Sequence, residues 1–386
     1  MNDPMMSQPV CSRRNFLQLT AGTLASLALL SAPKLSFANS NKITTTNLAN
    51  CPTDPLHVVQ QSEMIQNAYK KMLSTVKSIQ NPNLRKTVLD IIASPAPTLM
   101  QQYPSNNHIE TVYQKLLAQN LVDQNKIQWD TLFPKYNSAN KSPQPFISAP
   151  GSGYNSHHSY PGGLVTHTVT NLCIASAICS IYQEVYGYQV DRDVVIASEA
   201  LHDLHKPWVF QWNEDGSCLT ELPIAGTGSH HILSIAESIY RSLPADVIVA
   251  QACAHNHPGS EKDEADVVGW IKAASIIAGK DPIALGLLSN DGGALPVPHK
   301  QEGYITHLAD HDWVLSVPAA QKSIKVLQEI AKRDYSMTLT DLKSAKFNHF
   351  RNYIAAQVSM MQINHAMADG GGKTSVKSLV NRIIIK

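Results

Sequence analysis

The segment "ALHDLHKPWVF", residues 200–210, places a histidine and an aspartate side by side at the end of an apolar run. His202 and Asp203 form either half of a metal site or the polar end of a buried helix. The dipeptide alone does not decide between these two readings. A metal site would need further ligands from elsewhere in the chain, at positions that the fold can bring together.

The overall composition is that of a folded and nearly neutral protein. Of 386 residues, 43% are hydrophobic and 16% are charged, which is enough for a core in one large domain or two ordinary ones. The net charge is +1 and the basic residues are scattered, so nothing indicates a nucleic-acid-binding surface. The unusual feature is the sixteen histidines, several of which fall between residues 157 and 257.

The first 38 residues have the pattern of an export signal. Arg13 and Arg14 precede a short apolar run at 19–32, and residues 36–38 have the small-x-small form of a cleavage site. The S-R-R-x-F-L pattern resembles twin-arginine signals, and this implies export of a protein that has already folded, often with its cofactor. The apolar run is shorter than the roughly 20 residues of a membrane-spanning helix.

We therefore expect a cleavable signal at 1–38 and the twin-arginine export machinery as a partner. The location would be periplasmic or otherwise exported, with no membrane span after the signal is removed. Cleavage after Ala38 would leave five cysteines, so at most two disulfides could form. Cys173 and Cys179 lie in an apolar segment and are expected to be free and buried.

The chain beyond the signal reads as helices joined by loops. Residues 39–54 are polar and predict a linker. Apolar residues at three- and four-residue intervals predict a helical region over 55–133. Residues 134–160 are rich in Pro, Gly, Ser and Asn and predict a long functional loop, whose "GSGYNSHH" part we expect to be a flexible lid beside a pocket. Further helices are expected at 162–186, 191–204, 229–242, 244–256, 264–278, 318–333 and 338–367.

Few segments alternate as a half-buried strand would, so the sequence predicts an all-α protein. Its N-terminal helical layer would pack on a larger helical bundle. The tail "KTSVKSLVNRIIIK" at 373–386 is not assigned to an element.

Three further polar clusters lie at the ends of the expected helices. His167 follows a Pro-Gly-Gly turn, His230 and His231 follow a Gly/Ser turn, and His255 and His257 precede a Pro-Gly turn. A lone histidine of this kind is usually a core or capping group, but four clusters on successive helices are harder to explain in that way. Imidazole and carboxylate together bind Zn, Fe, Mn or Ni, and a bridging aspartate suits two ions about 3.5–4 Å apart.

The order of these clusters resembles the HD-domain superfamily of metal-dependent phosphohydrolases. "HHSYPGGLVTHTVTN" (157–171) resembles the segment with the first metal histidine, and "VVIASEALHDLHKPW" (194–208) resembles the helix that ends in H-D-x-x-K. The likeness covers about 155–280 and extends to 312 at most. It implies an HD-like metal-binding domain at 161–312, followed by C-terminal helices and a tail at 313–386.

The resemblance also implies a set of metal ligands. His231 is preferred to His230 because it lies one residue deeper in its helix, and His257 is the alternative to His255. Lys206 corresponds to a lysine that can approach the substrate phosphate. The expected ligands are His167, His202, Asp203, His231, His255 and Asp310, and they would hold one or two divalent ions among which Mn, Fe, Zn, Ni and Mg are not distinguished.

Two positions depart from the family pattern. His205 stands where glycine is usual, so it could supply an extra proton donor or a further ligand. Ser275 stands where the last aspartate is expected. Asp310 and Asp312 are candidates to replace that aspartate, and Asp310 is preferred because the preceding alanine matches the usual Ala-Asp pair.

The leading hypothesis is therefore an exported HD-type hydrolase that acts on a small phosphorylated substrate such as a nucleotide. Asp203 would hold the ions that activate water, and Lys206, with His205, would stabilise charge on the phosphate. One alternative is an HD-fold di-iron oxygenase that uses the six-ligand set. The other is a non-catalytic metal- or ligand-binding protein, which the serine at 275 would favour.

Overall fold

The structure is a computed structural model that describes residues 41–368 and 370–386, and residues 43–386 form one compact unit. The expected signal at 1–38, with Arg13 and Arg14, lies outside the described residues. The prediction of an all-α fold is confirmed, because helices dominate the described residues and the strands there are two residues long. The domain boundaries within this unit stay a prediction.

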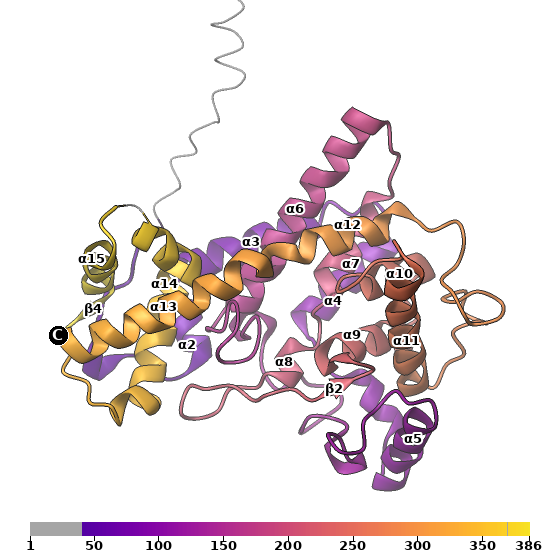
Figure 1. Cartoon of the computed structure of the whole chain (residues 1–386), viewed down its shortest axis with the longest axis horizontal. Helices are drawn as coiled ribbons and strands as arrows, with labels where there is room; N and C mark the ends of the chain where they lie inside the picture. Colours follow the sequence, from indigo (N-terminus) through magenta and orange to yellow (C-terminus); the bar gives the residue numbers. More distant parts are fainter. Residues whose placement is uncertain (1–40, 369) are drawn as a thin grey trace, which may run out of the picture. The chain divides into compact units, whose positions relative to one another are not determined.

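An N-terminal helical layer precedes the helices that carry the candidate ligands. The side chains of Asp54, Ser62 and Asn81 accept backbone N–H groups at the starts of the first three helices, and each such cap contributes about 1 kcal/mol. α3 packs on α6, α4 on α7 and α5 on α11 (Figure 1). The bounds are α2 Pro55–Gln60, α3 Glu63–Val76, α4 Pro82–Ala93 and α5 Asn106–Ala118.

The central bundle contains the segments singled out in the sequence. α6 packs on α7 and α12, α7 packs on α10, and α9 packs on α11. The bounds are α6 Gly163–Tyr186, α7 Arg192–Leu201, α8 Lys206–Val209, α9 Ser229–Tyr240, α10 Ala245–Ala252, α11 Glu261–Ala278 and α12 Gln301–Ala309, with a short hairpin of β2 Pro223–Ile224 and β3 Thr227–Gly228.

Three of these helices end earlier than the sequence predicted, and α7 and α10 thereby leave candidate ligands beyond their ends. α7 ends at Leu201 rather than at 204, so His202 and Asp203 lie at and beyond its C-terminus. α10 ends at Ala252 rather than at 256, so His255 lies in the following turn. A side chain in a turn can point across the ends of several helices, and these early ends therefore help the histidines to converge.

The C-terminal region closes the unit with α13 Trp313–Asp334, α14 Ala345–Ala368 and α15 Lys373–Ile383. α15 accounts for the tail that the sequence left unassigned. Part of the expected linker at 39–54 forms regular structure, because β1 Thr46–Asn47 pairs in parallel with β4 Ile384–Ile385. Short 3-10 helices occupy Leu48–Asn50, Thr98–Gln102, Trp129–Thr131, Phe146–Ser148, Asp310–Asp312 and Asp341–Lys343.

The cysteines and the longest apolar helix differ in part from expectation. All five described cysteines are free, and Cys179 is buried as predicted, whereas Cys173 is exposed. α6 is long and apolar enough to cross a membrane by length and composition, and it is the one described helix that passes this test. Its first half is buried and carries His167, so it is a core helix of the bundle.

Candidate metal centre

Two glycines at the start of α6 set the position of the first histidine. Gly162 has φ of +83°, and a Cβ there would meet the Ile65 side chain at 2.6 Å. A Cβ on Gly163 would lie 1.7 Å from the carbonyl oxygen of His158. The backbone of the long loop therefore packs directly on the first turn of α6, which only glycine permits. One turn later His167 points into the bundle.

Four side chains from three parts of the chain meet beyond that turn. The Nε2 atoms of His167 and His202 are 3.3 Å apart. Asp203 Oδ2 lies 3.0 Å from the first of these nitrogens and 3.1 Å from the second. Asp310 Oδ1 lies 3.2 Å and 3.4 Å from the same two nitrogens. The expected ligand Asp310 is thus brought to the site from the 3-10 helix after α12.

These separations are those of ligands around a small metal ion. Bonds of about 2.1 Å place neighbouring ligand atoms about 3.0 Å apart at right angles and about 3.4 Å apart in a tetrahedron. The two imidazole nitrogens lie 3.3 Å from each other and 3.0 to 3.4 Å from the carboxylate oxygens of Asp203 and Asp310. Two nitrogens and two carboxylate oxygens are also a donor set that first-row transition metals accept. The residues present therefore fit a metal ion.

A second group of donors shares both carboxylates with the first. The other oxygen of Asp203, Oδ1, lies 3.3 Å from His230 Nε2. The other oxygen of Asp310, Oδ2, lies 3.6 Å from His255 Nε2. Ligand atoms of Asp203, His230 and His255 lie within 4.8 Å of one another. Each carboxylate thus faces the first histidine pair with one oxygen and a histidine of the second group with the other.

Outer contacts orient two of the imidazole rings. His202 Nδ1 lies 2.7 Å from the backbone carbonyl oxygen of Glu199, and His230 Nδ1 lies 2.6 Å from Glu221 Oε2. A proton on Nδ1 in each ring leaves the Nε2 lone pair for a metal, which is how histidine ligands are commonly held. Such contacts fix both the direction of the ring and the tautomer.

The two carboxylates of the first group create an electrostatic environment that favours a positively charged species beside them. Burial opposes charge on His202, but the carboxylates of Asp203 and Asp310 hold the pKa of its imidazole well above the usual value. Burial would likewise raise the pKa of the two carboxyl groups, yet nearby His202 holds both well below their usual range. Opposite charges within a few ångströms dominate burial here, as a cation site requires.

The structure places His230, and not the expected His231, beside Asp203. His231 Nε2 lies 3.2 Å from the carbonyl oxygen of Ala252, and its ring stacks on that of His255 with centroids 4.0 Å apart. Burial and the neighbouring His230 lower its pKa to about 3. His231 therefore packs against the ring of His255, a candidate ligand, while His230 faces Asp203.

The expected proton donor His205 also lies elsewhere. Its ring packs edge-on against Trp208, and its Nε2 lies 3.4 Å from Glu237 Oε2 on α9. Burial would raise the pKa of Glu237, but the nearby His205 and Arg241 and the hydrogen bond from Thr98 lower it to about 2. The contacts of His205 are those of a packing residue, and they do not support the catalytic role expected for it.

Lys206 lies beside the candidate ligands but does not project freely into an open pocket. Its Nζ is 2.5 Å from Asp203 Oδ2 and donates a hydrogen bond of 2.5 Å to the carbonyl oxygen of Gly151. The side chain is 4% exposed, so its charge is desolvated next to the carboxylate. Lys206 thus joins the metal centre to the long loop, and a direct contact with phosphate stays a prediction.

The remaining candidates lie in three separate places. Ser275 is buried in α11, where its hydroxyl has no hydrogen-bond partner. Asp312 pairs with His158, whose Nε2 is 3.0 Å from Asp312 Oδ2. His257 lies against Tyr304 and His307 with ring centroids 6.0 and 4.7 Å away. None of these contacts is with the four side chains of the first group.

Several residues near the centre were missed in the sequence. Asn171, one turn after His167, donates a hydrogen bond of 2.8 Å to Asp310 Oδ1. Glu221 lies two residues before β2, and no local pattern marks it. His157 lies in the long loop with its ring centroid 5.2 Å from that of His167. The paired histidines before Pro-Gly-Gly were a visible signal for the last of these.

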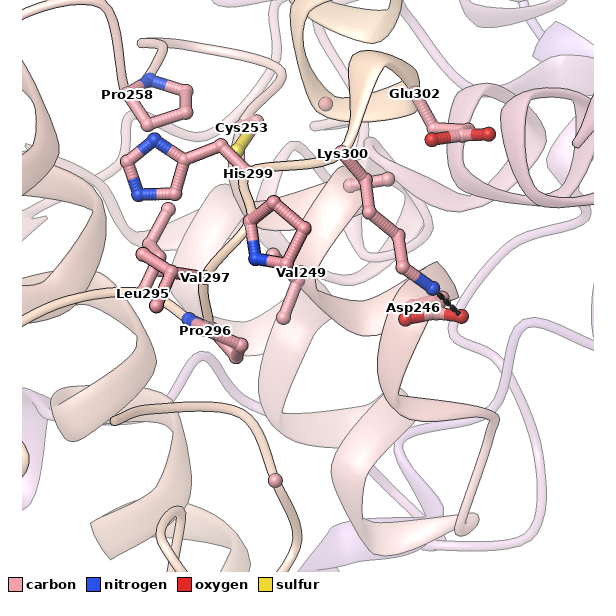
Figure 2. A pocket seen from close by; sticks show the side chains of 14 residues that line it. Asp246, Val249, Cys253, Pro258, Leu295, Pro296, Val297, His299, Lys300 and Glu302 are labelled. Carbon is pink, nitrogen blue, oxygen red and sulfur yellow. Dashed lines mark hydrogen bonds and ion pairs between the residues drawn. The ribbon is translucent and has the colours of Figure 1, made fainter. Parts of the chain in front are cut away.

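A separate cavity of about 130 Å³ lies beside α10 and is lined by α10, the segment before α12 and the start of α12. Figure 2 shows Cys253, Leu295 and Val297 around it, with Lys300 paired to Asp246 at one side. Its lining includes no member of the His/Asp groups. The candidate metal ligands, the histidines and aspartates of the two groups, therefore lie outside this cavity.

The histidine and aspartate groups thus define a candidate metal centre in an all-α bundle. Over 107 residues the chain is 38% identical to the dihydroneopterin 2′,3′-cyclic phosphate phosphodiesterase of Methanocaldococcus jannaschii. The match covers 28% of this chain and 42% of that protein, so the chain spans less than half the length of this curated relative. No family model matches the chain, and no solved structure matches it.

Proposed function

We propose that the protein is a metal-dependent hydrolase of phosphate esters that acts on a small phosphodiester. The observation that carries this proposal is the sharing of Asp203 and Asp310, each of which faces both histidine groups. The similarity to a protein named as a cyclic phosphate phosphodiesterase supports the same class of reaction. A cyclic phosphate is accordingly the first substrate to test.

The residues of the centre suit this chemistry. His167, His202, Asp203 and Asp310 would hold one ion, and His230 and His255 would complete a second site with the same carboxylates. Ions bound there lower the pKa of a bound water and neutralise charge on a phosphoryl group. Lys206 places its side-chain nitrogen beside Asp203 and links the centre to the loop through the carbonyl oxygen of Gly151.

Elemental analysis of the purified protein, paired with turnover, tests the proposal. We expect at least one equivalent of a transition metal and hydrolysis of bis(p-nitrophenyl) phosphate or a 2′,3′-cyclic nucleotide. Asp203→Asn removes a charge that both groups share, so it should lose metal and lower kcat/KM by about 10³-fold or more, which corresponds to about 4 kcal/mol. Asp246→Asn, at the separate cavity, is the matched control and should retain both.

Equal metal content in the Asp203→Asn variant and the unchanged protein would refute the assignment of the centre. Metal-loaded protein that cleaves no phosphodiester would refute the reaction. The di-iron oxygenase stays a second candidate because six donor residues do converge when His230 takes the place of His231. Iron as the bound metal together with oxygen-dependent turnover would favour it over hydrolysis.

The non-catalytic alternative loses its main support. It depended on Ser275 standing where an aspartate is expected, and Asp310 now supplies a carboxylate to the first histidine pair. The exported location and the twin-arginine route remain predictions from residues 1–38.

A further inference from the structure

The segment 150–160, termed here the 150s loop, is fixed to the protein at several points. Gly151 accepts the hydrogen bond from Lys206, and its N–H donates to the carbonyl oxygen of His158 at 2.9 Å. Arg351, fully buried on α14, donates to both the backbone oxygen and the hydroxyl of Ser159. The same guanidinium lies 4.0 Å from the centroid of the Tyr154 ring. Side chains from distant segments therefore anchor the loop, and its expected flexibility stays a prediction.

Two adjacent histidines of the 150s loop differ in burial and in their neighbours. His158 is 5% exposed, and its two ring nitrogens face Asp312 Oδ2 at 3.0 Å and the Tyr160 hydroxyl at 3.3 Å. His157 is half-buried and lies with its ring 5.2 Å from that of His167. His158 anchors the loop, whereas His157 is presented beside the metal centre.

The hydrogen bonding of His157 leaves one nitrogen for a ligand. Its Nδ1 lies 3.2 Å from the hydroxyl oxygen of Ser156, and its Nε2 has no hydrogen-bond partner among the described residues. When the Ser156 hydroxyl donates to Nδ1, the proton of the neutral ring is on Nε2. A half-buried N–H donor beside a candidate metal centre is suited to an anionic oxygen of the substrate.

We propose that His157 is a substrate-contacting residue that donates a hydrogen bond from Nε2 to a non-bridging oxygen of the phosphate. The proposal rests on the proposed phosphodiesterase function and names a residue that carries out substrate binding at that centre. Lys206 is less free for this contact because its ammonium group is already engaged by Asp203 and Gly151. The anchors of the 150s loop hold the donor in place before substrate arrives, and such preorganisation is what makes a donor effective.

Kinetics of His157→Ala and His157→Gln test this role. We expect the alanine variant to lower kcat/KM for bis(p-nitrophenyl) phosphate by about 10²-fold, the usual loss for one such donor. The glutamine amide can place an N–H group near the position of Nε2, so His157→Gln should recover a large part of the activity. Metal content and melting temperature should stay at the values of the unchanged protein. His365→Gln, at an exposed histidine of α14, is the matched control.

Three outcomes would overturn the proposal. His157→Ala with full metal and activity within threefold would show that the residue does not contact the phosphate. Loss of metal in that variant would make His157 a ligand instead, and a fall in melting temperature that His157→Gln does not restore would make it a structural residue.

If the unchanged protein binds metal but turns over no phosphodiester, the proposed function fails and His157 can still be examined. Titration of the metal-loaded protein with inorganic phosphate should then show weaker binding to His157→Ala, and equal binding would refute the contact.

Discussion

Cys253 and His255 lie two residues apart at the end of α10, yet they belong to different regions of the molecule. Cys253 lines the cavity beside α10, whereas His255 faces Asp310 in the candidate metal centre. Burial raises the pKa of the Cys253 thiol to about 12, so at neutral pH it is not a thiolate nucleophile. Two residues that follow the end of α10 therefore lie in very different chemical environments.

The two regions also differ in how their polar groups are satisfied. Around the cavity, Lys300 pairs with Asp246, and Glu302 accepts the backbone N–H of Asp191 at 2.6 Å. In the metal centre, imidazole nitrogens and carboxylate oxygens converge on shared points instead of forming separate pairs. The cavity beside α10 has volume for a small ligand but few converging polar groups. The converging nitrogen and oxygen donors of the other region instead match the coordination of a metal ion.

The largest difference between the two regions is expected in the free energy of unfolding, when one glycine of each region is changed to alanine. Gly163→Ala would drive a Cβ to 1.7 Å from the backbone oxygen of His158, which cannot move without breaking the 150s loop. Gly303→Ala, beside the cavity, would meet the Cys253 sulfur at 3.0 Å, and a side chain can yield by a few tenths of an ångström.

Denaturant unfolding measures this contrast. We expect Gly163→Ala to lower the free energy of unfolding by about 3 kcal/mol or more, the upper range for overpacking. Gly303→Ala should stay within about 1 kcal/mol, because in α12 the better helix propensity of alanine offsets the crowding. Similar values for the two variants would show that the loop does not pack on α6 as described.

A smaller contrast is expected for two glutamates that each face a histidine. Glu221 lies 2.6 Å from His230 in the metal centre, and Glu264 lies 3.2 Å from His299 beside the cavity. Glu221→Gln should weaken the binding of one metal ion by 10- to 100-fold, the usual effect of losing an outer contact to a ligand, or about 1.4–2.7 kcal/mol. Calorimetric titration with Zn²⁺ or Mn²⁺ measures this effect.

Glu264→Gln is the control for that measurement and should leave the metal affinity unchanged. Equal weakening by both variants would mean that the cavity and the metal centre are one coupled region. No weakening by either would mean that His230 does not bind the ion.

The helices α6 and α7 could be predicted because local sequence determines them, and the family resemblance of their segments indicated the candidate ligands His167, His202 and Asp203. Apolar periodicity locates α6 and α7, and their ends place His167, His202 and Asp203 in a fixed order. The choice between His230 and His231 depends on the rotation of α9, since adjacent residues on a helix point about 100° apart. The packing of that helix on α11 sets its rotation, and no local pattern records it.

The 150s loop shows a second limit of sequence reasoning. Its Gly- and Ser-rich composition predicts flexibility, but its anchors come from distant segments. Arg351 lies 192 residues beyond Ser159 in the chain, and Lys206 lies 55 residues beyond Gly151. The position of His205 was hard to predict for a similar reason, because its neighbour Glu237 is brought to it only by the packing of α9.

The smallest effect is expected at the edge of the cavity, where Lys300 pairs with Asp246. The two side chains are 59% and 48% exposed, so water and salt screen their attraction. Lys300→Met should change the free energy of unfolding by less than about 1 kcal/mol, the range measured for exposed ion pairs. Metal content and kcat/KM should be unchanged, because the pair has no contact with the histidine groups. Turnover lowered more than threefold at full metal content would instead show that α10 transmits changes from the cavity to His255, and the separation of the two regions would then be wrong.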